Sequence, residues 1–396
     1  MKKQAQPAHR AKHHRLPQLV RRLIAVLLAA ALALTVWTYR AALTPTNIKA
    51  WVQENLLGNV GGGGYPVGFS GSADPGNFSV SGDAPALVTD MMFVHLSTRG
   101  KMRAQQQHGY TSPLLRRSGS CFLLLDLGGK TFRTSTDGVQ FSENTEYPYT
   151  LFGGAAAQNG SYALVSMSTG YTSQVTVFDG AGQTRFEWAS QTDLISAVAF
   201  SADGKRLAAA SFTSQSGQLR AAIRIFALDQ KEPLAVQTYD GLMPLDIAFR
   251  SDGAAICVGD TGAVCLSPDG TSQLYDYDGQ ILSAYALHPT AGAALALSAA
   301  ADGRAGSLVR LDGDFAAHTL TRFSQPIIDL DLAETQLLVL QSGVVTRWNV
   351  DNAQDGVAEV GTDCTRVCAD SGTGFFLLGA SEVRHCAGFD GAEAAP

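Results

Sequence analysis

The six cysteines are the residues of this 396-residue chain whose spacing most directly suggests chemistry, and all lie beyond residue 120: Cys121, Cys257, Cys265, Cys364, Cys368 and Cys386. Cys257 and Cys265 flank a short turn at 260–262, between two apolar stretches. A tight antiparallel hairpin places the two residues across from each other, within the Cα separation that a disulfide needs. The geometry therefore permits a Cys257–Cys265 disulfide.

A second group of cysteines lies near the C-terminus and admits three interpretations. In an extended strand Cys364 and Cys368 are about 13 Å apart, too far to bridge each other, but either is able to reach Cys386. Together with His385 the three thiols offer a zinc ligand set, although their spacing is not that of a zinc knuckle or ribbon. Plain buried thiols are the third interpretation, and we assign no metal site.

Two carboxylate pairs, Asp276/Asp278 and Asp329/Asp331, are the acidic groups closest to a cation-binding pattern. A calcium loop needs more oxygen ligands and a terminal Glu, and both are missing here. We therefore interpret these acids as residues of turns and strand ends.

A catalytic nucleophile is not evident. The nearest match to the G-x-S-x-G elbow, residues 68–72, ends in Ser, so its last Gly is missing. The histidines beyond the N-terminal tail are dispersed among different repeats: His95, His108, His288, His318 and His385. We assign no catalytic residue and no cofactor. The alternative is a hydrolase or oxidoreductase whose His, Asp or Glu side chains converge at the centre of the fold.

Short apolar strands recur along the chain and must position these groups. They begin at residues 86, 121, 162, 206, 255, 293, 336 and 375. Their spacing matches the roughly 40–45 residues of a four-stranded propeller blade. A second strand of two-residue period follows, as in Val344–Val350, and Asp-Gly dipeptides such as Asp203-Gly204 supply tight turns.

These repeats predict an all-β fold, a β-propeller of eight blades, or of seven if the first unit shares a blade with the last. A pair of β-sandwiches explains the even spacing less well. Phrases such as Ser201-Ala202-Asp203-Gly204 after an apolar strand resemble WD40-like or quinoprotein-like repeats. The Trp-Asp dipeptide is absent, and the two tryptophans of the repeats, Trp188 and Trp348, are too few for the docking motifs of quinone-dependent propeller dehydrogenases.

A hydrophobic segment, Leu23–Tyr39, precedes the repeats and contains no charge. In a helix it spans about 25 Å, close to the hydrocarbon thickness of a bilayer. Seven basic residues precede it, which predicts a single-pass anchor with a cytoplasmic N-terminus and an extracellular C-terminal domain. A cleaved signal peptide is the rival interpretation, but its apolar core is normally shorter.

The domain boundaries follow from these features. We expect a basic cytoplasmic tail at 1–22, a transmembrane helix at 23–39 and an amphipathic helix close to the membrane at 44–58. A Gly-rich linker with the segment leading into the repeats covers 59–83, the propeller covers 84–391, and 392–396 form a disordered tail. Eight of the 29 basic residues lie before residue 41, whereas all 35 acids follow it. The acidic domain would repel nucleic acid, so no nucleic-acid partner is expected.

The whole layout resembles an uncharacterised family of single-pass, membrane-anchored propeller proteins of Gram-positive bacteria. The resemblance rests on the basic tail, the single span and the glycines at 61–64 before Tyr65-Pro66-Val67. It also includes His108-Gly109-Tyr110 and Trp188-Ala189-Ser190. The resemblance implies a location and a fold, but no activity.

The resulting functional hypothesis is a protein-binding or scaffolding module at the cell surface, held in the membrane by Leu23–Tyr39. Insertions between propeller strands collect on one face and form recognition loops. The longest insertion follows the fourth repeat, at Thr213–Leu219 and Gln230–Pro244. We therefore predict a partner surface there: Tyr239, Leu242 and Met243. A purely structural component of the cell envelope is a further alternative.

Overall fold

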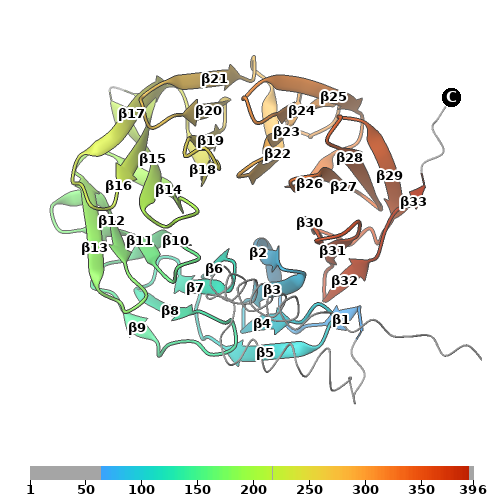
Figure 1. The fold of residues 1–396 in the computed structure, drawn as a ribbon, viewed down its shortest axis with the longest axis horizontal. Helices are drawn as coiled ribbons and strands as arrows, with labels where there is room; N and C mark the ends of the chain where they lie inside the picture. The colour runs from blue at the N-terminus through green and yellow to red at the C-terminus, as the bar shows by residue number, and fades with distance from the viewer. Residues whose placement is uncertain (1–63, 216, 392–396) are drawn as a thin grey trace, which may run out of the picture. The chain divides into compact units, whose positions relative to one another are not determined.

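The computed structural model describes residues 64–215 and 217–391 and shows an eight-bladed β-propeller (Figure 1). These residues form strands and turns only, without a helix, so the described part of the chain holds no membrane-crossing helix. The all-β prediction and the count of eight blades are confirmed. The predicted anchor at 23–39, the helix at 44–58 and the tail at 392–396 lie outside the described residues.

Each blade is an antiparallel sheet whose strands run in chain order from the central axis to the rim (Figure 1). Blade one comprises β2 (Ala73–Ser81), β3 (Ala84–Thr89), β4 (Met92–Leu96) and β5 (Met102–Gln107), and blade two comprises β6 (Pro113–Ser118), β7 (Cys121–Asp126), β8 (Thr131–Ser135) and β9 (Thr145–Glu146). Blade three comprises β10 (Leu151–Ala156), β11 (Tyr162–Ser168), β12 (Tyr171–Phe178) and β13 (Thr184–Ser190). Blade four comprises β14 (Leu194–Phe200), β15 (Arg206–Gln215), β16 (Gln218–Ala227) and β17 (Pro233–Asp240). Blade five comprises β18 (Pro244–Phe249), β19 (Ala255–Gly259), β20 (Gly262–Leu266) and β21 (Ser272–Asp276). Blade six comprises β22 (Ile281–His288), β23 (Gly292–Ser298), β24 (Gly306–Leu311) and β25 (Ala317–Phe323), and blade seven comprises β26 (Ile327–Leu332), β27 (Gln336–Gln341), β28 (Val344–Asn349) and β29 (Gln354–Glu359).

The eighth blade closes the ring with strands from both ends of the described chain. It consists of β30 (Arg366–Ala369), β31 (Phe375–Leu378), β32 (Glu382–Cys386) and, as its outer strand, β1 (Val67–Gly68). Val67 pairs with Val383, and a short last strand, β33 (Asp390–Gly391), adds to the rim of blade seven beside β29. The seven-blade alternative is wrong, because the strand that completes the last blade precedes the first repeat and is not part of it.

The propeller also begins earlier than the boundary expected at residue 84. Strands β1 and β2 both lie within the segment 59–83 that we expected to lead into the repeats. Residues 73–77 of β2 read Ala-Asp-Pro-Gly-Asn, a sequence of turn-formers that carries no strand periodicity. Burial of Phe78 against the neighbouring blade nevertheless holds the strand in place.

The apolar strands found in the sequence are the second strands of the blades, and they form the cores between blades. Leu337 and Val339 of β27 pack towards blade six, whereas Leu338 and Leu340 pack towards blade eight. Both faces of such a strand are buried, which explains why its sequence is continuously apolar and not alternating. The ring is therefore held together by eight similar cores.

The ring has two unlike faces. On the lower face, hairpins join the first strand of a blade to the second and the third to the fourth, and many carry Asp-Gly turns. On the upper face, each outer strand connects to the inner strand of the next blade. Gly64 lies at the lower face, beside Gly100 in the β4–β5 turn, and the Tyr65 hydroxyl donates to the Ser97 carbonyl over 3.0 Å. The described chain therefore enters the propeller from its lower face.

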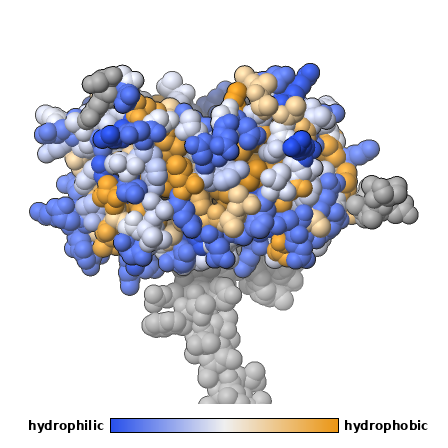
Figure 2. Space-filling view, turned by 90° about the horizontal axis from the view of Figure 1, so that it is seen from above, coloured by the Kyte–Doolittle hydropathy of each residue, from blue (hydrophilic) through white to orange (hydrophobic). Residues whose placement is uncertain are grey.

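The expected insertion after the fourth repeat is not a loop. Thr213–Leu219 forms the tip of the long β15–β16 hairpin, and Gln230–Pro244 contains the whole outer strand β17. Blade four extends further along the strand direction than its neighbours because β15 and β16 are 10 residues long, and no recognition loop is inserted. Figure 2 views the ring edge-on and shows hydrophobic side chains scattered over a mainly hydrophilic wall.

Candidate functional site

Charged and polar side chains from five different blades converge at the propeller axis. All six stand on innermost strands, and we call them the axial cluster: Arg116 of β6, Asp246 of β18, Tyr285 of β22, Asp329 and Asp331 of β26, and Arg366 of β30. Asp246, Asp329 and Arg366 occupy the same level, opposite Val258, Leu340 and Leu378 of their second strands. The fold thus collects at one place groups that lie 250 residues apart in the sequence.

The two carboxylates of β26 clamp the inner strand of the next blade. Asp329 accepts hydrogen bonds from the Arg366 guanidinium and from the Val367 N–H, both over 2.8 Å. Asp331 accepts one from the Ala369 N–H over 2.7 Å. These contacts satisfy backbone donors of β30 at the axis, where no further strand is available to pair with them.

Burial makes these carboxyls weaker acids than in water. It raises the pKa of Asp329 to about 7, although the Arg366 charge and the Val367 N–H act in the opposite direction. Burial also raises the pKa of Asp331 and of Asp246. The cluster therefore holds an acid, Asp329, that is able to take up a proton near neutral pH, which is a property common at functional sites.

Arg116 and Tyr285 complete the cluster. Burial lowers the pKa of Arg116, and the carboxylate of Asp246 partly offsets this effect. The Tyr285 hydroxyl donates to Asp246 Oδ2 over 3.5 Å. Arg116 retains an exposed side chain although the inner strands surround it, as expected of a group lining the channel. Within the described residues its guanidinium has no carboxylate within 4.0 Å and only donates to the Leu115 carbonyl.

Blades three and four contribute only small or apolar groups to the axis. Their inner strands hold Gly153, Gly154 and Ala155 in β10, and Ala197 and Ala199 in β14. Gly154 has no room for a side chain, because a Cβ would lie 2.5 Å from the Ala163 carbonyl oxygen. The axis is therefore asymmetric, with charges on one side and small residues on the other.

An apolar rim lies beside the axial cluster on the upper face. Four exposed side chains stand where inner strands β18, β22 and β26 begin: Met243, Leu245, Ile281 and Ile328, each 40–44% exposed. Leu245 and Ile328 are the extra residues of two β-bulges, at Pro244/Asp246 and Ile327/Asp329. In each case the next residue is an Asp that pairs again with the second strand of the blade. Three neighbouring blades, five to seven, thus supply the apolar rim beside the axial cluster.

The predicted partner surface is placed differently by the structure. Leu242 is a core residue, 2% exposed, and Tyr239 is half-buried against the same core. The prediction was wrong for Leu242, because the turn after β17 folds it over Gly259, where a Cβ would meet its side chain at 2.7 Å. Only Met243 is exposed, and it belongs to the apolar rim.

The Cys257–Cys265 disulfide does not form, and all six cysteines are free. Cys257 pairs with Val264 and Cys265 pairs with Ile256, so the two are one residue out of register. A shift of one residue turns the side chains to opposite faces of the sheet. Cys257 accordingly packs in the core towards blade four, and Cys265 packs in the core towards blade six.

The other candidate ligand groups serve local structure. The described residues contain no group of three or more His, Cys, Asp or Glu able to hold a metal ion. Cys364 accepts from Arg384 over 3.3 Å, His385 contacts Asp370 over 3.0 Å, and Asp276 accepts from the Asp278 N–H in its turn. Asp329 and Asp331, in contrast, belong to the axial cluster and not to a strand-end turn.

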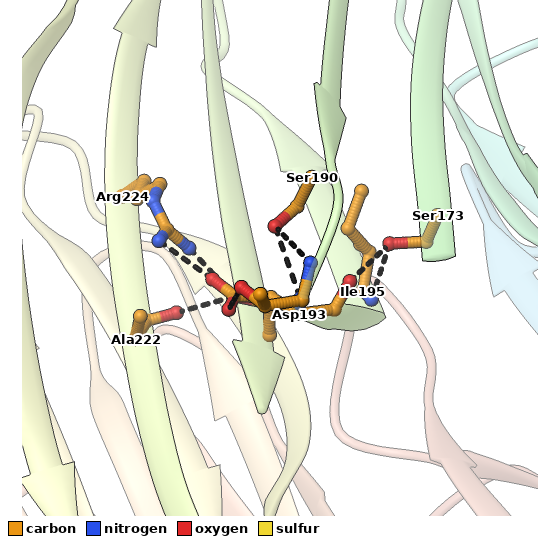
Figure 3. A network of polar contacts seen from close by, with 8 residues as sticks. Ser173, Ser190, Asp193, Ile195, Ala222 and Arg224 are labelled. Atoms are coloured by element: carbon orange, nitrogen blue, oxygen red, sulfur yellow. Dashed lines mark hydrogen bonds and ion pairs between the residues drawn. The ribbon is translucent and has the colours of Figure 1, made fainter. Parts of the chain in front are cut away.

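A second buried polar network lies between blades three and four, and its members hydrogen-bond to one another (Figure 3). Arg224 donates to Asp193 and to Ser211, both over 2.7 Å, and its guanidinium lies 4.7 Å from the Trp188 ring. Asp193 in turn accepts from Thr192, and its carbonyl accepts from the Ser173 hydroxyl over 2.7 Å. Because these groups are largely satisfied by one another, the network anchors the β13–β14 loop and offers little to a ligand.

Sequence reasoning missed the role of Arg116, Asp246, Tyr285 and Arg366. Asp246 and Arg366 left a signal, since each is the one charged residue of an otherwise apolar short strand. Arg116 and Tyr285 left none, because their strands hold other polar residues as well. To predict that these side chains converge, one must know how each first strand pairs with the second strand of its blade. The spacing of the repeats does not give that pairing.

Comparisons with solved structures support the architecture. The chain is similar to the computationally designed Ika8 protein, with 12% identity, a TM-score of 0.57, and coverage of 81% of this chain and 98% of that one. It is similar to the C-terminal WD40 domain of Sif2, with 10% identity, a TM-score of 0.56, and coverage of 83% and 100%. It also resembles Chaetomium thermophilum Sqt1 bound to the N-terminus of ribosomal protein L10, with 13% identity, a TM-score of 0.52, and coverage of 80% and 92%.

At this level of identity the likenesses show the WD40-like propeller fold and nothing finer. No curated protein sequence matches the chain. Residues 89–367, which span all blades from the first to the last, match the model of a family of unknown function, and the chain therefore belongs to that family, DUF5711.

Proposed function

We propose that this protein is a membrane-anchored, extracytoplasmic propeller that binds a protein partner on its upper face. The observation that carries the proposal is the distribution of apolar surface. Among the described residues, seven of the twelve exposed large apolar side chains lie on the upper face: Met91, Met167, Tyr171, Met243, Leu245, Ile281 and Ile328. Exposed large apolar side chains gathered on one face are typical of a protein-interaction surface.

The point at which the chain enters the ring agrees with this choice of face. Gly64, the first described residue, lies at the lower face, on the opposite side of the ring from the apolar rim. The uncharged segment at 23–39, its basic flank and the resemblance to anchored propellers of Gram-positive bacteria support the cell-surface location. Sqt1, one of the similar propellers, is a protein whose structure holds a peptide of a ribosomal protein.

Site-specific photocrosslinking in the full chain tests the proposal. A photoreactive residue at Leu245 or Ile328, each 40% exposed on the upper face, is expected to give a discrete protein adduct in native membranes. Val350, 53% exposed in the β28–β29 turn of the lower face, is the control position and is expected to give none. Equal adducts from both faces, or none from the upper face, would contradict the proposal.

The axial cluster favours a second candidate function, an extracytoplasmic hydrolase with its site on the axis. Asp329 has a pKa of about 7 and lies at the same level as Asp246, which keeps a hydrogen bond to Tyr285. Carboxyls that titrate near neutrality are suited to general acid–base work. Activity screening of the purified domain against ester, phosphoester and glycoside substrates, with Asp329→Asn as the comparison, tests this candidate; turnover that survives Asp329→Asn would exclude the axial site.

A further inference from the structure

Three of the four rim side chains stand at the upper end of blade five and at the start of blade six. They are Met243, Leu245 and Ile281, each 40–44% exposed. Leu274 of β21 is 52% exposed and adds an apolar group on the outer wall, beside Gly262, where a Cβ would lie 3.0 Å from the leucine side chain. We call this surface the blade-five patch.

Acidic side chains stand among these apolar groups. Asp260, in the β19–β20 turn, accepts a hydrogen bond from the Met243 N–H over 2.7 Å, and its own N–H donates to the Met243 carbonyl over 3.1 Å. Asp276 ends β21, and Asp278 lies in the loop that leads to Ile281. All three acids are exposed. The patch therefore presents apolar and negatively charged groups together.

No basic residue of blade five balances these acids. Arg250 is the one base of the blade, and it lies in the β18–β19 turn of the lower face, paired with Asp252 over 3.0 Å. On blade six, Arg304 shares the β23–β24 turn with Asp302, so the two charges offset each other. The upper end of blade five therefore keeps the negative charge of its acids.

The same asymmetry extends over a whole sector of the ring. Blades five to seven, residues 244–359, contain 15 acids but only 5 arginines and no lysine. Blades one to four, residues 73–240, contain 14 acids and 13 basic residues. A negative potential over the sector attracts cationic groups and repels acidic proteins and anionic lipid headgroups. The field of the sector and the local carboxylates thus favour the same kind of partner.

We infer that the blade-five patch binds a basic, apolar segment of a partner protein, in which lysine or arginine residues lie among large aliphatic ones. The aliphatic groups cover the exposed rim side chains, and the cations pair with Asp260, Asp276 and Asp278. Removal of apolar surface from water contributes the affinity, whereas the charges select the partner and speed its approach. The inference rests on the proposed protein partner of the upper face and adds the chemistry of that partner.

Photocrosslinking in native membranes, with a photoreactive residue at Ile281 of the full-length protein, tests the inference. The combined change Asp260→Asn, Asp276→Asn and Asp278→Asn removes three charges but keeps side-chain oxygens that accept the hydrogen bonds of these turns. We expect the adduct yield to fall by about tenfold in this triple variant. Mass spectrometry of the adduct should find lysine or arginine close to the crosslinked residue of the partner.

Salt provides a second readout that needs no variant. Raising the ionic strength from about 0.05 M to about 0.5 M screens exposed charges, so the adduct yield of the Ile281 position should fall several-fold. The triple variant should respond much less to salt, because its patch no longer carries these charges.

The matched control is a second triple variant, Asp269→Asn, Asp314→Asn and Asp351→Asn, in exposed turns on the lower face of the same three blades. It changes the net charge equally and should leave the adduct yield unchanged. Because all six acids are exposed, both variants should fold as the unmodified protein does, and urea unfolding checks this.

The possible outcomes separate this inference from the proposed function. The inference is overturned if the patch variant or high salt leaves the yield unchanged, if the lower-face variant lowers it equally, or if the crosslinked segment is acidic. Absence of any adduct from positions 245, 281 and 328 alike overturns the proposed function, and this inference with it.

Discussion

Asp329 shows how a single buried group shapes both stability and the chemistry of the axis. Its carboxyl is held by Arg366 and by the Val367 N–H, yet burial raises its pKa to about 7. The native state therefore binds a proton more tightly than the unfolded chain, whose Asp has a pKa near 3.9. The stability that this proton contributes is fully present below the unfolded pKa and is lost as the pH rises through the folded one.

The first prediction follows from that sign. Between pH 5 and pH 8 the free energy of unfolding should fall by about 2–3 kcal/mol through Asp329. Asp329→Asn keeps the shape but cannot titrate, so its stability should depend less steeply on pH over the same range. Urea unfolding at several pH values measures both slopes, and equal slopes would show that another group carries the effect.

The Asp193–Arg224 pair illustrates the opposite case, a buried pair with a purely structural role. The two side chains are 12% and 16% exposed, and they lock the β13–β14 loop to blade four. Asp193→Ala leaves the Arg224 charge buried without its partner and should destabilise the protein by about 3–5 kcal/mol. The exposed pair Arg220–Asp240 in the same blade is the control, and Asp240→Ala should leave the urea midpoint unchanged. If Asp193→Ala and Asp240→Ala have similar urea midpoints, the Asp193–Arg224 pair does not stabilise the fold.

The cysteines provide a third prediction at the residue scale. Five of the six thiols are buried and Cys386 is half-buried, and burial raises the pKa of each thiol. Because the thiolate is the reactive form, native protein should react slowly with a thiol reagent at pH 8, whereas urea-unfolded protein should expose all six. A reductant should not move the urea midpoint; a midpoint that falls on reduction would reveal a disulfide.

Secondary-structure elements were predicted best where burial on both faces left a strong pattern. The eight apolar second strands stood out in the sequence because each packs against two blades, as Leu337–Leu340 does. The inner strands were harder to recognise, since they combine small, apolar and charged residues according to what faces the axis. Strand β2 and the closing strand β1 carry little periodicity, and long-range pairing decides both of them.

The candidate site was less predictable than the fold for the same reason. Asp329 and Asp331 were visible in the sequence as a pair, but their role depends on the β30 backbone of the next blade. Leu242 was predicted to lie on the surface because it belongs to the segment interpreted as an insertion, although the turn folds it inward. The predicted Cys257–Cys265 disulfide was wrong because the two cysteines are one residue out of register, and sequence spacing alone does not determine the register.

Closure by β1 gives a prediction at the scale of the element. Val67 packs in the core between blades eight and one and pairs with Val383. Val67→Asp places a charge against that core and should lower the free energy of unfolding by about 2–3 kcal/mol. Val236→Asp makes the same change on the outer strand β17, where the side chain is 43% exposed, and should have little effect. Chemical denaturation of both variants makes the comparison, and an equal effect would show that β1 does not close the ring.

At the scale of the whole molecule, the ring places the entry of the described chain and the proposed binding surface on opposite faces. The chain enters at the lower face beside Gly100, and the axial cluster and apolar rim face the opposite side. Eight similar cores hold these surfaces at fixed positions around one axis.

The last prediction tests the proposed membrane anchor and the orientation of the ring. Because the native thiols are buried, a cysteine introduced at an exposed position is the preferred site for a fluorescent label. Met167→Cys, on the upper face, and Val350→Cys, on the lower face, replace side chains that are 52% and 53% exposed, so their labelling is comparable. In proteoliposomes with an acceptor dye on the lipid headgroups, the proposed anchor predicts stronger energy transfer from position 350 than from position 167, because the described chain enters the ring at the lower face. Equal transfer from both positions would mean that the tether does not orient the ring, and its absence from both would mean that residues 23–39 do not anchor the protein.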